Sequence, residues 1–247
     1  MADTTRAPLD LIAFDGDDTL WHNERSYRMG RRRFHDLLRR LDVRECEEDI
    51  DARVNEIELG NLRYYGYGAS SFVLSLIEAS IDLTRGRIPG GDVRDLIRLA
   101  KDMLSEPVEL FDGASDVVAQ LAGSHALVLI TKGDLLHQQS KAERSGLSVH
   151  FQQIEVVSEK TPDTYARILA RHGVVPERFL MIGNSLRSDV VPVARLGGWA
   201  VHIPAVPSWG HEDVTIPTDL EDRYFELDHL RRLPAFIEAF SPKAPGQ

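Results

Sequence analysis

The sequence is poor in cysteine and contains no long apolar run. Cys46 is the only cysteine among 247 residues, so no disulfide can form within the chain. No apolar run approaches the ~20 residues that span a bilayer. The segment Met1–Asp10 also lacks the apolar core of a signal peptide. We therefore expect a cytoplasmic protein with no membrane partner.

The sequence also has fewer positively charged than negatively charged residues. The 29 Lys and Arg residues are outnumbered by 39 Asp and Glu residues, which gives a formal net charge of −10. A nucleic-acid-binding protein needs clustered cations to neutralise phosphates, so we expect no nucleic-acid partner. A small phosphorylated metabolite is compatible with this charge, because a metal ion and one or two local cations outweigh a distant field.

The remaining composition, with 43% hydrophobic and 28% charged residues, is typical of a globular domain with a core. Short apolar runs predict strands at 9–14, 126–130, 154–157, 179–182 and 199–203. Helical periodicity predicts helices at 135–145, 162–172, 189–196 and 230–240. Strands that alternate with helices predict an α/β fold with a doubly wound parallel sheet.

The pattern between the first two strands is different. It predicts four helices, near 24–41, 45–62, 70–83 and 91–105, with breaks at Tyr64–Gly68 and Arg87–Gly91. We therefore expect two domains: an α/β core formed by 1–20 and 109–247, and a helical cap formed by 21–108. The cap joins the core close to the end of the first strand, where a lid would lie.

Polar side chains follow four of the predicted strands. The segments are Asp15-Gly16-Asp17-Asp18-Thr19-Leu20, Thr131-Lys132-Gly133-Asp134, Ser158-Glu159-Lys160-Thr161-Pro162, and Gly183-Asn184-Ser185 with Asp189 beyond it. Taken singly, each has an ordinary structural explanation, such as a turn, a helix N-cap or a surface charge. Because ligands bind at the carboxyl ends of parallel strands, their joint occurrence predicts one functional site.

With these motifs the sequence resembles the haloacid dehalogenase (HAD) superfamily, in its phosphatase type with a helical cap inserted after the first motif. The resemblance covers the core from Leu9 to Ile203 and, loosely, the helical insertion. It rests on Phe14-Asp15-Gly16-Asp17-Asp18-Thr19-Leu20, Thr131, Lys160, and Met181-Ile182-Gly183-Asn184 with Asp189. It implies a Rossmann-like core and the Mg²⁺-dependent hydrolysis of a small phosphorylated metabolite through an aspartyl-phosphate.

The resemblance also implies roles for individual residues. Asp15 would be the nucleophile, and Asp17 the general acid that protonates the leaving group and then the base that activates water. Thr131, Lys132 and Lys160 would bind the phosphoryl oxygens.

The implied magnesium ligands are oxygen atoms, as this ion prefers. Asp15 would supply one oxygen and the backbone carbonyl of Asp17 another. The family usually has an aspartate where this chain has Asn184. Asn184 and Asp189 are both candidates for the remaining ligand, and which of them binds directly is open.

Two segments of the cap are candidates for substrate contact. Tyr64-Tyr65-Gly66-Tyr67-Gly68 is either a contact loop that places Tyr65 and Tyr67 on the substrate or a packed helix connection, and both interpretations are open. The run Arg31-Arg32-Arg33 is more typical of a solvated helix face. In the core, Pro207-Ser208-Trp209-Gly210-His211 is expected to be a structural loop.

Several alternative functions fit parts of the pattern. A phosphomutase shares all four motifs and differs mainly in how its cap excludes water. A 2-haloacid dehalogenase is disfavoured, because such enzymes lack a carboxylate at the position of Asp17. A non-catalytic binding member is suggested only by Asn184, and a phosphorylatable receiver domain would be about half as long. The physiological substrate and the oligomeric state are open.

Overall fold

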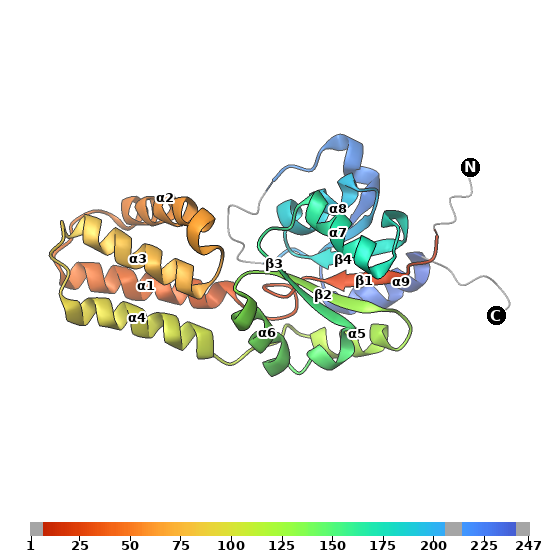
Figure 1. Ribbon diagram of the computed structural model, residues 1–247, viewed down its shortest axis with the longest axis horizontal. Coiled ribbons are helices and arrows are strands. Elements are labelled where there is room, and N and C mark those ends of the chain that lie inside the picture. Colours follow the sequence, from red (N-terminus) through yellow and green to blue (C-terminus); the bar gives the residue numbers. More distant parts are fainter. Residues whose placement is uncertain (1–6, 206–213, 241–247) are drawn as a thin grey trace. The chain divides into compact units, whose positions relative to one another are not determined.

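The computed structural model describes residues 7–205 and 214–240 of the chain (Figure 1). Its internal contacts divide the chain into two compact units. The first consists of Met1–His22 with Val108–Gln247, and the second of Asn23–Pro107. The predicted loop at 207–211 lies outside the described residues. That the second unit serves as a cap stays a prediction.

The first unit is built on a six-stranded sheet in the order β3-β2-β1-β4-β5-β6, with every neighbouring pair parallel. The strands are β1 Leu11–Phe14, β2 Leu127–Lys132, β3 Gln153–Val157, β4 Phe179–Gly183, β5 Trp199–His202 and β6 Tyr224–Glu226. This arrangement confirms the predicted parallel α/β fold. The sequence patterns did not predict the edge strand β6.

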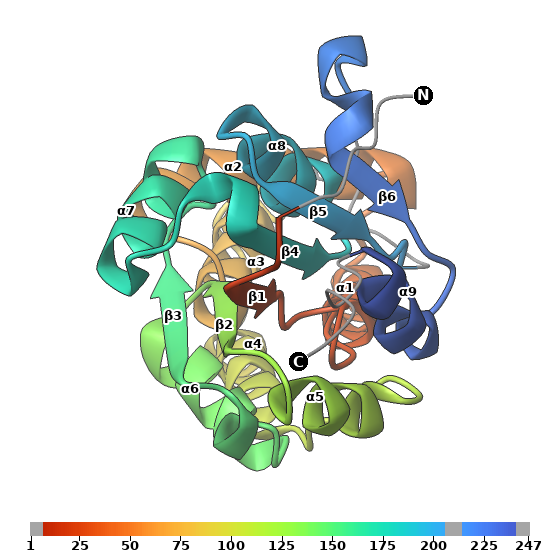
Figure 2. The same ribbon diagram turned by 90° about the vertical axis from the view of Figure 1, so that its right-hand side faces the viewer.

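Helices cover both faces of this sheet (Figure 2). They are α5 Ala114–Ala122, α6 Leu135–Arg144 and α9 Leu233–Phe240 on one face, and α7 Pro162–His172 and α8 Val191–Arg195 on the other. Along β1, Ile12 and Phe14 pack into the core with α5 and α9, whereas Leu11 and Ala13 pack into the core with α7 and α8. Because both faces are buried, the strand is a continuous apolar run without alternation.

The second unit consists of four helices, as predicted. They are α1 Glu24–Arg40, α2 Glu47–Tyr65, α3 Ala69–Leu83 and α4 Gly90–Ser105. Its own core includes the fully buried side chains of Phe34, Val54 and Leu76. The predicted break at 64–68 is shorter than expected, because α2 continues through Tyr65 and ends at Gly66, whose φ is 67°.

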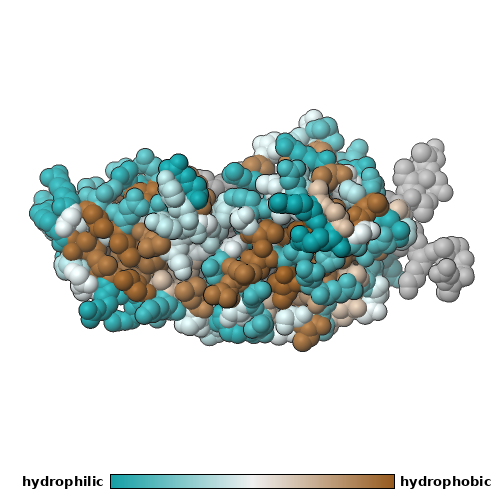
Figure 3. Space-filling view, in the orientation of Figure 1, coloured by the Kyte–Doolittle hydropathy of each residue, from teal (hydrophilic) through white to brown (hydrophobic). Residues whose placement is uncertain are grey.

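The surface of the second unit carries some apolar side chains. Those of Leu74 and Ile81 are exposed on α3, where hydrophobic residues gather in the space-filling view (Figure 3). Exposed apolar side chains are common on the surfaces of globular proteins. No helix within 7–205 or 214–240 has the length and apolarity needed to cross a bilayer.

Candidate active site

The side chains that could take part in catalysis lie together at the carboxyl edge of the α/β sheet. Asp15 follows β1 directly, and its amide donates a hydrogen bond to the carbonyl of Ile182 at 2.8 Å. This bond joins the ends of the neighbouring strands β1 and β4. The register also pairs Phe14 with Leu129, so Asp15 and Thr131 lie at adjacent strand ends.

Asp15 is the centre of a buried polar cluster and is only 6% exposed. The Lys160 ammonium donates to Asp15 Oδ1 at 2.5 Å and to Asp189 Oδ1 at 2.7 Å. The Thr19 hydroxyl lies 2.9 Å from Asp15 Oδ2 and 3.2 Å from Asn184 Oδ1. The structure therefore brings together residues from the first, third and fourth predicted motifs.

Burial and charge oppose each other in this cluster. Burial raises the pKa of Asp15 to about 7, against the lowering effect of Lys160, and the nearby Asp189 charge adds to the rise. Burial alone would lower the pKa of Lys160, but the two carboxylates outweigh it and raise that pKa above its ordinary value. Lys160 therefore keeps its positive charge beside Asp15.

Asp189 is held by protein donors at both oxygens. Lys160 binds Oδ1, and the backbone amide of Ser185 donates to Oδ2 at 3.0 Å. The carboxylate fits here only because Gly183 has no side chain: a Cβ at this position would lie 2.1 Å from Asp189 Oδ2. This arrangement makes Asp189 the anchor of Lys160, and whether it also binds a metal stays a prediction.

Asn184 offers an amide oxygen to the same cluster. Its Oδ1 and the Oδ2 of Asp15 both lie within hydrogen-bonding distance of the Thr19 hydroxyl. A carboxylate, an amide oxygen and the main-chain carbonyl of Asp17 form a donor set that suits Mg²⁺. Among the described residues no group of three or more His, Cys, Asp or Glu is arranged to hold a metal ion.

Thr131 and Lys132 lie at the end of β2. Thr131 is completely buried, and its hydroxyl has no hydrogen-bond partner among the described residues. A buried polar group without a partner is costly, so such groups in native proteins call for a ligand or a water molecule. Lys132 is half-buried, and its Nζ lies 3.3 Å from the hydroxyl oxygen of Ser188.

Asp17 is fixed by residues that the sequence patterns did not indicate. Lys141 Nζ donates to its two oxygens at 2.5 and 2.7 Å, Gln138 donates at 2.8 Å, and the Trp21 indole N–H donates at 2.6 Å. Burial would raise the pKa of Asp17, but Lys141 outweighs it and lowers that pKa.

Burial, helped by the charge of Lys141, lowers the pKa of His137 to about 4, so His137 is neutral near pH 7.

The predicted substrate-contact residues Tyr65 and Tyr67 belong to the helical unit. The side chain of Tyr65 is exposed in the last turn of α2, and Tyr67 lies in the turn between α2 and α3. The expected contact loop is thus reduced to three residues, Gly66–Gly68. Binding of substrate by either tyrosine stays a prediction.

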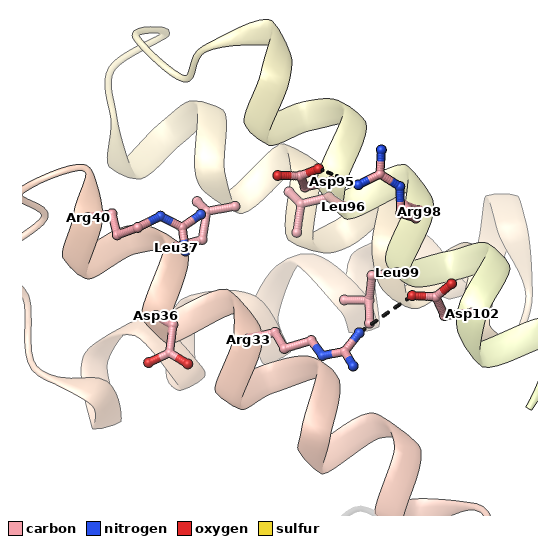
Figure 4. A pocket seen from close by; sticks show the side chains of 9 residues that line it. All are labelled: Arg33, Asp36, Leu37, Arg40, Asp95, Leu96, Arg98, Leu99 and Asp102. Atoms are coloured by element: carbon pink, nitrogen blue, oxygen red, sulfur yellow. Dashed lines mark hydrogen bonds and ion pairs between the residues drawn. The ribbon is translucent and has the colours of Figure 1, made fainter.

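The helical unit also contains a cavity of about 310 Å³ (Figure 4). It is lined by Arg33, Asp36, Leu37, Arg40, Asp95, Leu96, Arg98, Leu99 and Asp102, from α1 and α4. Its three arginines are paired with carboxylates: Arg33 with Asp102 at 3.6 Å, Arg98 with Asp95 at 3.1 Å, and Arg40 with Asp92 at 3.3 Å. These ion pairs account for the charges of the cavity without a ligand.

The predicted solvated face at 31–33 needs one correction. The side chain of Arg31 is only 21% exposed and is paired with Glu58 at 3.0 Å. Its guanidinium also donates to Asn55 at 2.7 Å. Arg31 therefore connects α1 to α2, whereas Arg32 and Arg33 are exposed as expected.

Comparison with known proteins gives a consistent result. The family model of the haloacid dehalogenase-like hydrolases matches residues 9–197. The structure of a haloacid dehalogenase-like family hydrolase from Xanthomonas campestris is 40% identical in sequence and has a TM-score of 0.83, with 96% of each chain covered. No curated protein matches the chain at a significant level.

Two more distant structures share the fold. The putative HAD-hydrolase YfnB from Bacillus subtilis, bound to magnesium, is 21% identical with a TM-score of 0.65, covering 94% of this chain and 100% of its own. A 2-haloacid dehalogenase from Pseudomonas syringae is 19% identical with a TM-score of 0.63, covering 94% of this chain and 98% of its own. A shared fold does not by itself fix the reaction, so the choice between reactions depends on the site.

Proposed function

Because this chain belongs to the haloacid dehalogenase-like hydrolases, we propose that it hydrolyses phosphomonoesters of small metabolites with the help of Mg²⁺. The observation that carries the proposal is the polar cradle at adjacent strand ends. It combines a buried carboxylate, Asp15, with the charged Lys160 and with the unpartnered buried hydroxyl of Thr131. A phosphoryl group would supply an acceptor oxygen for this hydroxyl and negative charge for this ammonium.

In the first step Asp15 attacks the phosphorus atom, and the bond from phosphorus to the leaving oxygen breaks. The product on the enzyme is an aspartyl-phosphate, which replaces one difficult displacement by two easier ones. Lys160 and Thr131 hold the phosphoryl oxygens and reduce the repulsion between the phosphoryl group and Asp15. Asp189 contributes by holding Lys160 in place at 2.7 Å.

Asp17 donates a proton in the first step and accepts one in the second. It gives a proton to the leaving oxygen in the first step and is then a carboxylate. In the second step it takes a proton from the water that attacks phosphorus, so that phosphate leaves and Asp15 is regenerated. The cycle closes with Asp17 protonated again. The hydrogen bonds from Lys141, Gln138 and Trp21 are those of the carboxylate form.

Asp15, the main-chain carbonyl of Asp17 and Asn184 would hold Mg²⁺. When bound, the ion supplies positive charge that neutralises the phosphoryl oxygens. Asn184 brings no charge of its own, so the site has one negative charge fewer than a site with an aspartate there. We therefore expect magnesium to bind more weakly than at an aspartate-containing site of this kind.

A second reaction, dehalogenation, is disfavoured by Asp17. Attack of Asp15 on carbon displaces a halide, which needs no proton from a second carboxylate. A half-buried, hydrogen-bonded Asp17 has no role in that reaction, whereas it has two roles in phosphomonoester hydrolysis. A phosphomutase would use the same residues and differ in transferring the phosphoryl group to a second substrate.

The proposal is tested by phosphate release from an aryl phosphate and from a panel of phosphorylated metabolites. Wild type and Asp15→Asn are each assayed with magnesium and with a chelator. We expect magnesium-dependent release by wild type and its loss in the variant. Folded wild-type protein that releases no phosphate from any ester, but releases halide from a 2-haloacid, would overturn the proposal in favour of a dehalogenase.

A further inference from the structure

The segment that follows β4 contains a π-helical turn at Leu186–Val190. In it the amide of Val190 donates to the carbonyl of Ser185, five residues back, at 3.3 Å. Turns of this kind are rare and are frequently found at functional sites. This one carries Asp189, so the contacts that hold the turn also determine where that carboxylate lies.

Ser188, the residue before Asp189, is held at three points. Its amide donates to the Ser185 hydroxyl at 2.9 Å, and its carbonyl accepts from the Tyr165 hydroxyl at 3.0 Å. Its own hydroxyl lies 3.3 Å from Lys132 Nζ. Because Ser188 is only 7% exposed, water competes little for these contacts, and the turn is fixed from three sides.

Tyr165 reaches the turn from a different element. It lies on α7, is completely buried, and packs its ring against Phe179 of β4 with 6.2 Å between the ring centroids. A buried tyrosine hydroxyl usually finds a hydrogen-bond partner, and this one has the carbonyl of Ser188. Packing of the core requires only the ring. The hydroxyl therefore contributes the bond that ties α7 to the turn.

The turn in turn contacts both lysines that are expected to bind the phosphoryl group. Its Asp189 accepts from Lys160 at 2.7 Å, and its Ser188 contacts Lys132. Lys132 is the last residue of β2, whereas Lys160 lies in the loop after β3. One fixed element that contacts both is well suited to set the distance between the two ammonium groups.

We propose that the turn Leu186–Val190 is the positioning element for Lys132 and Lys160, and that Tyr165 is the positioning residue that fixes this turn. This inference rests on the proposed function, because it assigns phosphoryl binding to the two lysines. Tyr165 acts through the main chain of Ser188 and takes no part in the reaction itself. Without its hydroxyl the turn is held less firmly, and the ammonium groups depart from the geometry that binds a phosphoryl group.

The test measures the binding of inorganic phosphate to wild type and to Tyr165→Phe by calorimetry, with magnesium present, together with kcat and KM for an aryl phosphate. A neutral hydrogen bond is worth a factor of about 2 to 10 in an equilibrium constant. We therefore expect Tyr165→Phe to weaken phosphate binding about 3- to 10-fold and to raise KM by a similar factor. Ser185→Ala releases the turn at its other end and should act in the same direction.

Two controls separate positioning from stability. Tyr224→Phe makes the same chemical change on the edge strand β6 and should leave phosphate affinity unchanged. Thermal denaturation is recorded for every variant, because a purely structural role would lower the melting temperature and leave the affinity of the folded protein unchanged. In the Asp189→Ala background, Tyr165→Phe should lower kcat/KM less than in wild type, since one of the groups that it positions is absent.

Wild-type phosphate affinity in folded Tyr165→Phe would overturn the proposal and leave Tyr165 with a role in core packing alone. An undiminished loss in the Asp189→Ala background would overturn it as well, because Tyr165 would then not act through the turn. If Tyr165→Phe does not fold, the same binding measurement on Ser185→Ala decides the question. Failure of the proposed function looks different: wild type then neither binds inorganic phosphate nor releases it from an ester, and this inference falls with it.

Discussion

A methyl group at Gly183 is predicted to disrupt the site by displacing Asp189, which holds Lys160 in place. The Cβ of Gly183→Ala would lie 2.1 Å from Asp189 Oδ2 and 2.3 Å from its Cγ. Real Cβ atoms essentially never approach closer than 3.0 Å, so Asp189 must move by about 1 Å. Asp189 is only 1% exposed.

The size of the effect follows from the bonds that this movement breaks. Asp189 would lose good geometry with Lys160, now at 2.7 Å, and with the amide of Ser185, now at 3.0 Å. Overpacking costs about 1–3 kcal/mol, and a weakened hydrogen bond to a charged group about 1.5–3 kcal/mol. We expect the free energy of unfolding to fall by about 2–5 kcal/mol. Activity should fall about 100-fold, because a displacement of about 1 Å misplaces Lys160.

The assay combines denaturant unfolding with kcat/KM for phosphate release. Gly123→Ala is the matched control in the same unit, since its Cβ would lie 3.4 Å from the nearest atom and its φ is −69°. In the double variant Gly183→Ala/Asp189→Ala the two losses should not add, because the second change removes the group that the first one displaces. Full activity in Gly183→Ala, or additive losses in the double variant, would refute the reasoning.

Three further predictions concern the cradle, the metal and the helical unit. Thr131→Val removes a buried hydroxyl that has no partner among the described residues. The free energy of unfolding should therefore rise by about 1 kcal/mol, while activity falls at least 10-fold. A variant that is less stable in thermal denaturation, or equally active, would contradict this. Because burial raises the pKa of Asp15 to about 7, protons compete with Mg²⁺ below that pH, and magnesium affinity measured by calorimetry should rise up to about tenfold per pH unit below 7 and level off above it. The same affinity at pH 6 and pH 8 would show that Asp15 is not the ligand. Phe34→Ala empties a fully buried position in the helical core and should destabilise that unit by about 3–5 kcal/mol; hydrogen exchange that stays unchanged in α1 and α3 would refute this.

The parallel sheet was predictable because the apolar sequence of its strands matches their burial on both faces. The apolar run before Asp15 had to be a strand buried on both faces, and the structure pairs it with β2 and β4 on either side. The bounds of α7 were equally clear, since Thr161 caps its first turn, Pro162 opens it and Gly173, at φ 66°, ends it. Signals of this kind depend only on the local sequence, so they can be recognised without the structure.

Other elements depend on tertiary contacts that a pattern does not contain. The helix α5 is short, begins after Gly113 at φ 77° without a side-chain cap, and was not predicted. The strand β6 has three residues and exists because it pairs with β5. The helix predicted at 189–196 instead begins with a π-helical turn at Leu186–Val190, which turns Asp189 inward to Lys160.

The candidate site divides in the same way. Residues at strand ends, such as Asp15 and Thr131, were predictable because the sheet gathers strand ends at one edge. Lys141 and Gln138 lie within α6, and only the docking of that helix brings them to Asp17. Their spacing of three residues places them on one helix face, but nothing in the sequence indicates what that face meets.

The most direct test of the account is to look for phosphate on Asp15 itself. Wild-type protein is mixed with magnesium and an aryl phosphate, quenched in acid within the first turnover and digested for mass spectrometry. The account predicts a phosphorylated peptide with the modification on Asp15, absent from Asp15→Asn. Rapid phosphate release with no phosphorylated Asp15 at any quench time would contradict it and would require a water molecule, not this carboxylate, as the attacking group.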